Sequence, residues 1–346
     1  MGEPPVEDPT ISIVVPVRNS AGTIRGLLDS LMGLDYDRDK LEIVVVDGNS
    51  VDGTRKIVEE YPVTLVEEEG RGLNAARNTG ARWSSGEIVA YTDGDCVIPP
   101  NWARAIAKNF KDPNVSFVGG PVHGYDKEGF LSRYMDETYF QVKPGFSWRT
   151  EATDISLLQF PAGCNMAFRR HALEKINLFD ERINYGFDDL YPVEKLGSRG
   201  FRIVLDPEVM VLHHHRTNLR ELFRQHFNYG RGGALLIIYK NASKLARWFT
   251  NYLFTSFLSL SMVLTLIGSG LYLRHSLTLH FGLGFLAFGF TILVVLYAEV
   301  AWRTGRLRKM ILYPVLDVAR GLFFTFGGVT QLLKELLGGR RKAQNF

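Results

Sequence analysis

The feature that most constrains this chain of 346 residues is a run of 24 residues without a formal charge, from Thr250 to Leu273. A helix of that length measures roughly 36 Å at about 1.5 Å per residue, enough to cross a bilayer hydrocarbon core of about 30 Å. A second apolar run begins at Ser276, ends at Ala298 and is followed by Trp302, an aromatic residue of the kind that anchors helices at a membrane surface. The sequence therefore predicts two transmembrane helices within residues 249–302.

The flanking charges predict how these helices are oriented. The segment after the second run, Arg303 to Lys309, is rich in Arg and Lys, whereas the link between the runs holds only Arg274 and His275. Because basic loops remain in the cytoplasm, this segment and everything before the first run are expected there. The first nine residues also lack the apolar segment of a cleavable signal peptide. We therefore expect a multi-pass protein of the cell membrane whose residues 1–215 form a cytoplasmic domain.

Two further segments are predicted to lie near the membrane. Residues 216–248 contain Arg216, Arg220 and Arg224 on one face of an amphipathic helix, which favours interfacial helices over an ordinary surface helix. Residues 303–346 contain a third apolar stretch that is interrupted by Asp317 and Arg320. Charges within a span are costly, so we favour a helix in the cytoplasmic interface and keep a third span as the alternative.

The first 215 residues alternate apolar runs of strand length with helical patterns. This alternation predicts an α/β fold with a mostly parallel sheet and helices on both faces. Ligands of such sheets bind beyond the carboxyl ends of the strands. The net charge of +3 gives no indication of a nucleic-acid partner, and we expect none. Cys96 and Cys164, the only two cysteines, are too few for a disulfide framework and fit a reducing compartment. Strands are expected at 11–15, 41–46, 63–66, 88–92 and 115–118, and helices at 21–32, 52–61, 72–83 and 101–110.

A pair of carboxylates follows the fourth predicted strand. Asp93 and Asp95 are one residue apart, so in an extended segment both can face one cation. Hard oxygen ligands of this kind suit Mn²⁺ or Mg²⁺ held together with substrate phosphates. His213 and His215 also share a face and could complete the site, although a polar strand edge near the membrane is the alternative.

Four other polar residues are candidates for a role in chemistry. Asp47 ends the second strand, where a carboxylate can accept hydrogen bonds from a base or a ribose, although a simple polar turn would look the same. Arg77 lies on a helix that begins near the expected pocket and could approach a diphosphate, although an Arg on a helix is more often solvated. Asp188 and Asp189 begin a predicted helix, and either can be a helix cap or a general base.

Together these motifs resemble the family 2 glycosyltransferases, inverting enzymes with the GT-A fold. Six motifs occur in the family's order within residues 1–215. They are Val14–Asn19 (VVPVRN), Val46–Thr54 (VDGNSVDGT), Ala76–Gly80 (ARNTG), Asp93–Asp95 (DGD), Pro161–Arg170 (PAGCNMAFRR) and Asp188–Asp189.

The resemblance implies a role for each matched position. Asp93 would contact the ribose or diphosphate, Asp95 would hold the metal ion, and Asp189 would be the catalytic base. Asp188 stands where the family has Glu, and Asn165 lies on the strand assigned to the acceptor side. The residues implied in the nucleoside pocket are Pro16, Arg18, Asn19 and Asp47.

The membrane end is similar to that of cellulose-synthase-like enzymes. Their interfacial helix carries Gln-x-x-Arg-Trp, which grips the growing polymer, and here Gln225 is followed by Asn228 and Tyr229 instead. The resemblance implies that Gln225 and Tyr229 lie on the acceptor side. Two spans also leave little material for a polymer channel. The layout resembles small archaeal mannosyltransferases of lipid-linked glycan assembly in N-glycan biosynthesis, which implies GDP-mannose as donor and a dolichyl- or polyprenyl-linked acceptor.

Three alternatives remain at this point. One is a processive polysaccharide synthase that uses a UDP-sugar. A second is a sugar nucleotidyltransferase, although the first strand is not followed by the Gly-rich phosphate loop that this class needs. A third is a non-catalytic membrane scaffold, which the acidic pair and the candidate base argue against.

Overall fold

The computed structural model describes residues 7–141, 145–154 and 160–343, with side chains described as far as residue 337. The first six residues and the side chains of the basic tail at 340–342 therefore lie outside the described part. The chain forms two compact units. The first comprises residues 1–136 and 141–217, and the second comprises residues 137–140 and 218–346.

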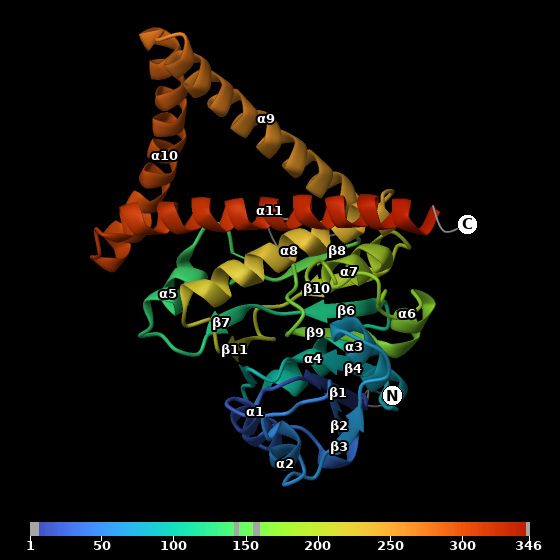
Figure 1. Ribbon diagram of the computed structural model, residues 1–346. Coiled ribbons are helices and arrows are strands. Elements are labelled where there is room, and N and C mark those ends of the chain that lie inside the picture. The colour runs from blue at the N-terminus through green and yellow to red at the C-terminus, as the bar shows by residue number, and fades with distance from the viewer. Residues whose placement is uncertain (1–6, 142–144, 155–159, 344–346) are drawn as a thin grey trace. The chain divides into compact units, whose positions relative to one another are not determined.

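The first unit is an α/β domain (Figure 1). Its strands and helices confirm the alternation that the sequence predicts. The elements are Ile11–Val17 (β1), Ile24–Met32 (α1), Leu41–Asp47 (β2), Thr54–Val58 (α2), Thr64–Glu67 (β3), Leu73–Arg82 (α3), Ile88–Tyr91 (β4), Cys96–Val97 (β5), Trp102–Phe110 (α4), Val115–Gly119 (β6), Val122–Gly124 (β7), Phe130–Glu137 (α5), Thr150–Ala152 (β8), Met166–Arg169 (β9), Arg170–Lys175 (α6), Leu190–Gly197 (α7), Arg202–Leu205 (β10) and Val211–His213 (β11).

The main sheet has the strand order β3-β2-β1-β4-β9-β6-β10-β8. Strands β3, β2, β1 and β4 are parallel, and β6 and β10 run in the same direction as these four. Strands β9 and β8 run the opposite way. The expected mostly parallel α/β sheet is thus confirmed, with two antiparallel strands added that the alternating pattern does not reveal.

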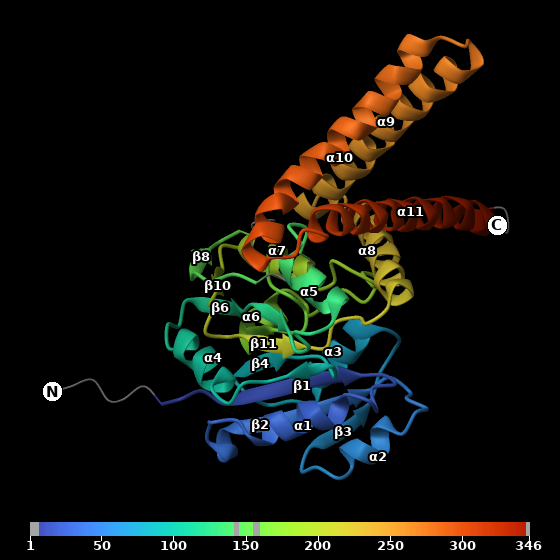
Figure 2. The same cartoon turned by 90° about the vertical axis from the view of Figure 1, so that its left-hand side faces the viewer.

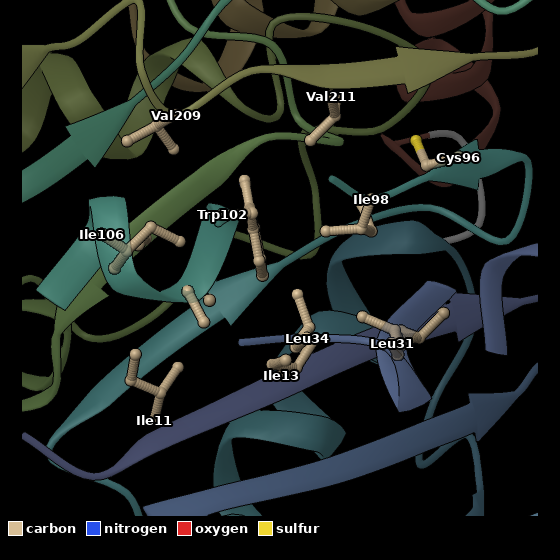
Figure 3. Packing of buried hydrophobic residues seen from close by; sticks show 14 of the residues in the cluster. Ile11, Ile13, Leu31, Leu34, Cys96, Ile98, Trp102, Ile106, Val209 and Val211 are labelled. Carbon is tan, nitrogen blue, oxygen red and sulfur yellow. The ribbon is translucent and has the colours of Figure 1, made fainter. Parts of the chain in front are cut away.

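Two apolar layers cover the two faces of this sheet. One contains Ile11, Ile13 and Val15 of β1 packed with residues of α1 and α4, and Trp102 lies within it with no exposed surface (Figure 3). The other contains Val14 of β1 and residues of α3, α6 and α7. Successive β1 residues enter opposite layers because side chains alternate along a strand.

A second, three-stranded sheet has the order β5-β11-β7. The register pairs His213 of β11 with Cys96 of β5 and with Gly124 of β7. The backbone N–H of His214 donates to the Asp95 carbonyl, 2.9 Å away, which extends the β5–β11 pairing past the last strand residue. This small sheet therefore brings the Asp95 segment beside the predicted histidines.

The second unit is helical. Its helices are Leu219–Tyr239 (α8), Lys244–Tyr272 (α9), Ser276–Thr304 (α10) and Lys309–Ala343 (α11). Helices α9 and α10 form a hairpin, and α11 lies at an angle to that hairpin and beside α8 (Figures 1 and 2). Among the described residues, three helices, α9, α10 and α11, are long and apolar enough to cross a membrane. The two predicted spans thus correspond to α9 and α10.

Helix α8 begins later than the basic pattern suggests. Asn218 caps it by accepting a hydrogen bond from the Glu221 N–H, 2.9 Å from the Asn218 side-chain oxygen. Arg216 therefore precedes the helix and belongs to the first unit. Only Arg220 and Arg224 of the predicted basic row lie on α8.

Glycines let α8 and α11 touch through their backbones. A Cβ atom on Gly230 would lie 1.8 Å from the Phe324 carbonyl oxygen, and one on Gly327 would lie 1.9 Å from the Phe227 carbonyl oxygen. No side chain fits at either distance. The two helices therefore pack in one register.

The charges that interrupt the third apolar stretch are paired within the second unit. Asp317 Oδ1 accepts hydrogen bonds from Arg320 Nη1 at 3.2 Å and from the Thr138 hydroxyl at 2.9 Å. Arg320 Nε donates to His226 Nε2 at 2.8 Å. Burial, aided by the nearby Arg320 charge, lowers the pKa of His226 to about 3, so this ring stays neutral and can accept. The face of α11 with large exposed apolar side chains includes Ile311, Val315, Val318, Leu322, Phe326, Val329, Leu333 and Leu336.

Candidate active site

The turns after β1 and β2 are joined to each other by hydrogen bonds. The backbone N–H of Asn19 donates to the Ser50 hydroxyl, and its side-chain oxygen accepts from the Val51 N–H. Both distances are 2.9 Å. Asp47, the buried last residue of β2, accepts from the Ser50 N–H and lies 3.4 Å from Arg55 Nη1. Asn19 has a φ of 52°, a left-handed conformation that Asn tolerates well. Pro16 is buried near the end of β1, and Arg18 is exposed just after it. The predicted nucleoside residues therefore lie together at the carboxyl ends of β1 and β2.

Asp95 lies beside His213, as the metal-site prediction requires. His213 Nε2 is 3.2 Å from Asp95 Oδ1, and the His213 side chain is 3% exposed. Arg216 Nη1 lies 3.7 Å from the other Asp95 oxygen. His214 points away from this pair and packs on the Tyr125 ring, because alternate residues of a strand face opposite sides.

The pair fits one edge of a divalent-ion site. Two neighbouring ligands of an octahedral ion with bonds of about 2.1 Å lie about 3.0 Å apart, close to the separation of His213 Nε2 and Asp95 Oδ1. Among the described side chains, no three His, Cys, Asp or Glu residues are gathered as a complete metal site. The pair therefore suits an ion that takes its remaining ligands from substrate phosphates and water.

The two consecutive aspartates have different surroundings. Arg77 is 1% exposed, and its Nη1 lies 2.5 Å from Asp188 Oδ2 and 3.1 Å from the Asn74 side-chain oxygen. The sequence suggests that Arg77 approaches a diphosphate, but here its guanidinium pairs with Asp188 inside the domain. A Cβ on Gly163 would lie 2.4 Å from Arg77 Nη2 and 3.2 Å from Asp189 Oδ2, so the glycine lets the 161–165 segment pass close to both side chains.

Asp189 accepts two backbone hydrogen bonds. Its Oδ2 accepts from the Gly163 N–H at 2.8 Å, and its Oδ1 accepts from the Leu190 N–H at 2.9 Å, which caps α7. Both alternatives from the sequence, helix cap and base, are therefore compatible. Burial of the carboxyl, followed by the neighbouring Asp188 charge, raises the pKa of Asp189 to about 6. A carboxylate with such a pKa can take a proton near neutral pH.

The backbone before these aspartates is strained. Tyr185 and Phe187 have φ values of 78° and 61°, in the left-handed region that bulky residues seldom occupy. Such strain is held in place by surrounding contacts and is common at functional sites. Here the two strained residues lie directly before Asp188 and Asp189, the N-cap of α7.

Comparison with known proteins decides the family. Residues 12–177 match the family described as Glycosyl transferase family 2. Glycosyltransferase AglE of Haloferax volcanii is 30% identical over 232 residues, which are 65% of this chain and 73% of AglE. The chain belongs to family 2 of the glycosyltransferases. It is accordingly an enzyme that transfers a sugar.

Other relatives of this glycosyltransferase extend the picture. The pre-mycofactocin glycosyltransferase of Mycobacterium tuberculosis is 27% identical over 234 residues, and the chain spans about half of it, 47%. The solved mannosyltransferase PcManGT from Pyrobaculum calidifontis, in complex with GDP-Man and Mn²⁺, is 25% identical with a TM-score of 0.58. That match covers 95% of this chain and 88% of PcManGT. S. aureus TarS in complex with UDP-GlcNAc, at 19% identity and a TM-score of 0.51, supports the GT-A-like fold alone, over 95% of this chain and 92% of TarS.

The residues predicted for the acceptor side of this glycosyltransferase belong to different units of the chain. Asn165 is fully buried, and its amide binds Trp102 Nε1 and the carbonyls of Pro121 and Val209. These contacts give Asn165 a structural position. Gln225 and Tyr229 lie on α8 in the second unit, so their acceptor role stays a prediction.

Two residues near Asp95 and His213 were not predicted from the sequence as site residues. Asp136 Oδ1 lies 2.9 Å from His215 Nε2, and Arg216 lies beside Asp95. Asp136 belongs to α5 and is separated from His215 by 79 positions, so no local pattern connects the two. Arg216 directly follows the three histidines, and its position after β11 is the signal that could have revealed it.

Proposed function

We propose that this glycosyltransferase transfers a single mannose from GDP-mannose, with inversion, to a lipid-linked glycan at the cytoplasmic face of the cell membrane. The observation that carries the proposal is that two carboxylates have different surroundings. Asp95 lies beside His213, a residue that commonly binds metal ions, whereas the raised pKa of Asp189 suits a general base. The first environment suits the leaving diphosphate, and the second suits the acceptor hydroxyl.

The reaction we propose is a single in-line displacement. Asp189 takes the proton of the acceptor hydroxyl, the hydroxyl oxygen bonds to the anomeric carbon, and the bond from that carbon to the diphosphate oxygen breaks with its electron pair. The nucleoside diphosphate leaves, and an α-linked donor gives a β-linked product. The Gly163 and Leu190 N–H groups hold Asp189 in place, and the Asp188 charge raises its pKa. Pro16, Arg18, Asn19 and Asp47 would line the nucleoside pocket.

Asp95 and His213 would hold Mn²⁺ or Mg²⁺, and Asp93 would contact the ribose or diphosphate or join the metal site. When bound, the ion neutralises charge that develops on the departing diphosphate. Arg216, which is 43% exposed beside Asp95, provides a positive charge at the same place.

The donor and acceptor are supported by different observations. PcManGT, whose structure contains GDP-Man and Mn²⁺, matches nearly the whole chain, which favours GDP-mannose. The apolar helices favour a membrane-held acceptor, and the absence of Arg and Trp from the 225–229 segment favours a single transfer over polymer synthesis.

For the membrane unit we propose that α9 and α10 span the bilayer and that α11 lies in its cytoplasmic interface. The angle between α11 and the hairpin supports this arrangement (Figure 2). The inward pairing of Asp317 and Arg320, opposite an apolar outer face, suits a helix whose one side meets lipid.

The test is a panel of GDP-mannose, UDP-glucose and UDP-GlcNAc with the full chain in lipid nanodiscs that contain a polyprenyl-linked saccharide. Release of nucleoside diphosphate and mass of the extended lipid are measured with Mn²⁺, with Mg²⁺ and with a chelator. We expect turnover of GDP-mannose that the chelator abolishes. Turnover of a UDP-sugar alone would overturn the donor assignment, and metal-independent turnover would overturn the metal site.

A further inference from the structure

Four side chains of the first unit form a continuous row that ends at the proposed metal site. In order they are Asp136, His215, His213 and Asp95. His215 Nε2 lies 2.9 Å from Asp136, the two Nδ1 atoms of the histidines are 3.3 Å apart, and His213 Nε2 lies 3.2 Å from Asp95. Both histidine side chains are 3% exposed, so the row runs through the protein interior.

The direction of the first hydrogen bond is set by Asp136. Both of its oxygens accept from the Gly124 N–H, at 3.0 and 3.1 Å, and a carboxylate has no proton to donate. His215 Nε2 is therefore the donor to Asp136. In a neutral imidazole the other nitrogen is then an acceptor, so His215 Nδ1 accepts from His213 Nδ1.

The same rule determines that Nε2 of His213, the ring nitrogen beside Asp95, carries no proton. Since its Nδ1 carries the proton, its Nε2 carries the lone pair, and that lone pair is the one beside Asp95. A metal-binding imidazole must be neutral and must present a lone pair to the ion. We propose that Asp136 and His215 are positioning residues that lock His213 in the tautomer and ring orientation needed to bind the catalytic Mn²⁺ or Mg²⁺.

Packing around the row supports this role. A Cβ on Gly124 would lie 2.8 Å from Asp136 Oδ2 and 3.0 Å from His215 Cδ2, so the glycine allows both side chains to press against its backbone. Gly124 is also the register partner of His213 in the small sheet. The Gly124 backbone and the side chains of Asp136 and His215 thus hold His213 beside Asp95. His215, predicted from the sequence as a ligand, becomes a support for the ligand His213.

The inference rests on the proposed metal site at Asp95, and the experiment separates the two. Mn²⁺ is titrated into the full chain in detergent, and free Mn²⁺ is measured by electron paramagnetic resonance for the wild type, Asp95→Asn, Asp136→Asn and His215→Phe. We expect Asp95→Asn to lose Mn²⁺ binding and the two supporting variants to weaken it by about 10- to 100-fold. The matched control is Asp126→Asn, which removes an exposed carboxylate from the same loop region and should change the affinity less than about twofold.

A spectroscopic measurement distinguishes positioning from general damage. At saturating Mn²⁺, electron spin echo modulation from a coordinated imidazole nitrogen should be present in the wild type and absent from His213→Gln. It should be weaker or altered in Asp136→Asn and His215→Phe, and Asp136→Glu should restore part of the affinity. Wild-type affinity and nitrogen modulation in both supporting variants would overturn this inference alone. No Mn²⁺ binding by the wild type would overturn the metal site and the inference together.

Discussion

Arg77 and Asp188 form a buried ion pair, with 2.5 Å between the guanidinium Nη1 and the carboxylate Oδ2. The pair gives two adjacent aspartates different surroundings, because Asp188 forms an ion pair with Arg77 whereas Asp189 accepts hydrogen bonds from backbone N–H groups. These surroundings, together with the raised pKa of Asp189, favour Asp189 over Asp188 as the base in our proposal.

The first prediction concerns Asp189→Asn. The amide keeps the shape of the side chain but cannot take a proton, so transfer should fall by about 10²- to 10⁴-fold while donor binding stays near wild type. The transfer rate and calorimetric binding of GDP-mannose check this. Glu174→Gln, an exposed change on α6, is the control, and near-wild-type transfer by Asp189→Asn would remove it as the base.

The pH dependence of transfer follows from the raised pKa of Asp189. The base must be deprotonated, so the rate should fall as the pH drops through about 6 and level off above it. The Asp188 charge helps to raise this pKa, so Asp188→Asn should move the acid limb to lower pH. Rate profiles of both proteins across the acidic and neutral range test the shift, and an unmoved limb in Asp188→Asn would contradict it.

Removal of one member of the ion pair should destabilise the domain. Arg77→Ala leaves the buried Asp188 charge without its partner, and we expect a loss of about 3–5 kcal/mol in the free energy of unfolding. The double variant Arg77→Met with Asp188→Leu leaves neither charge and should recover most of that loss. Thermal unfolding of the full chain measures both, and equal instability of the single and double variants would refute the explanation.

The alternation of apolar residues was sufficient to predict much of the α/β fold. Strand β1, for example, supplies Val14 and Val15 to opposite layers, a local pattern that any parallel strand between helices must show. Strands β9 and β8 are different. Their place is decided by partners far along the chain, since β9 is inserted between β4 and β6, and no local periodicity encodes that order.

The candidate site was predictable in a similar measure. Asp95 directly precedes β5 and Asp189 caps α7, so motif and position suffice to name both as candidates. The partners of these residues do not follow from motifs, because Arg77 and Asp188 are separated by 111 positions and Asp136 and His215 by 79. Only the folded chain shows that a predicted diphosphate ligand, Arg77, pairs with a predicted base candidate.

The glycine contact between α8 and α11 provides a test of the second unit. A methyl group at Gly230 would meet the Phe324 carbonyl oxygen, so Gly230→Ala should separate the helices and cost about 1–3 kcal/mol or more. Gly284→Ala on α10, where a Cβ would meet nothing within 4 Å, is the control and should be neutral or slightly stabilising. Thermal unfolding in detergent compares them, and equal effects would contradict the tight contact.

The proposed position of α11 can be tested by labelling. A cysteine that replaces Ala343, at the end of α11, should react with an impermeant maleimide in inside-out vesicles and stay unlabelled in intact cells. Arg274→Cys, between α9 and α10, should show the reverse accessibility. Labelling of both positions from the outside would establish α11 as a third span.

The packing of α8 against α11 also has a consequence for the timing of biosynthesis. His226 and Arg320 are hydrogen-bonded partners separated by 94 positions, and the apolar hairpin of α9 and α10 is made between them. At roughly 5–20 residues per second, α8 leaves the ribosome about 5–20 s before the helix that buries its glycine face exists. During that interval His226 and the glycine face of α8 are exposed on the nascent chain, because their partners on α11 have not been made. The helical unit can therefore complete its packing only after both hairpin helices have been synthesised, which makes the α8–α11 contact a late step of folding.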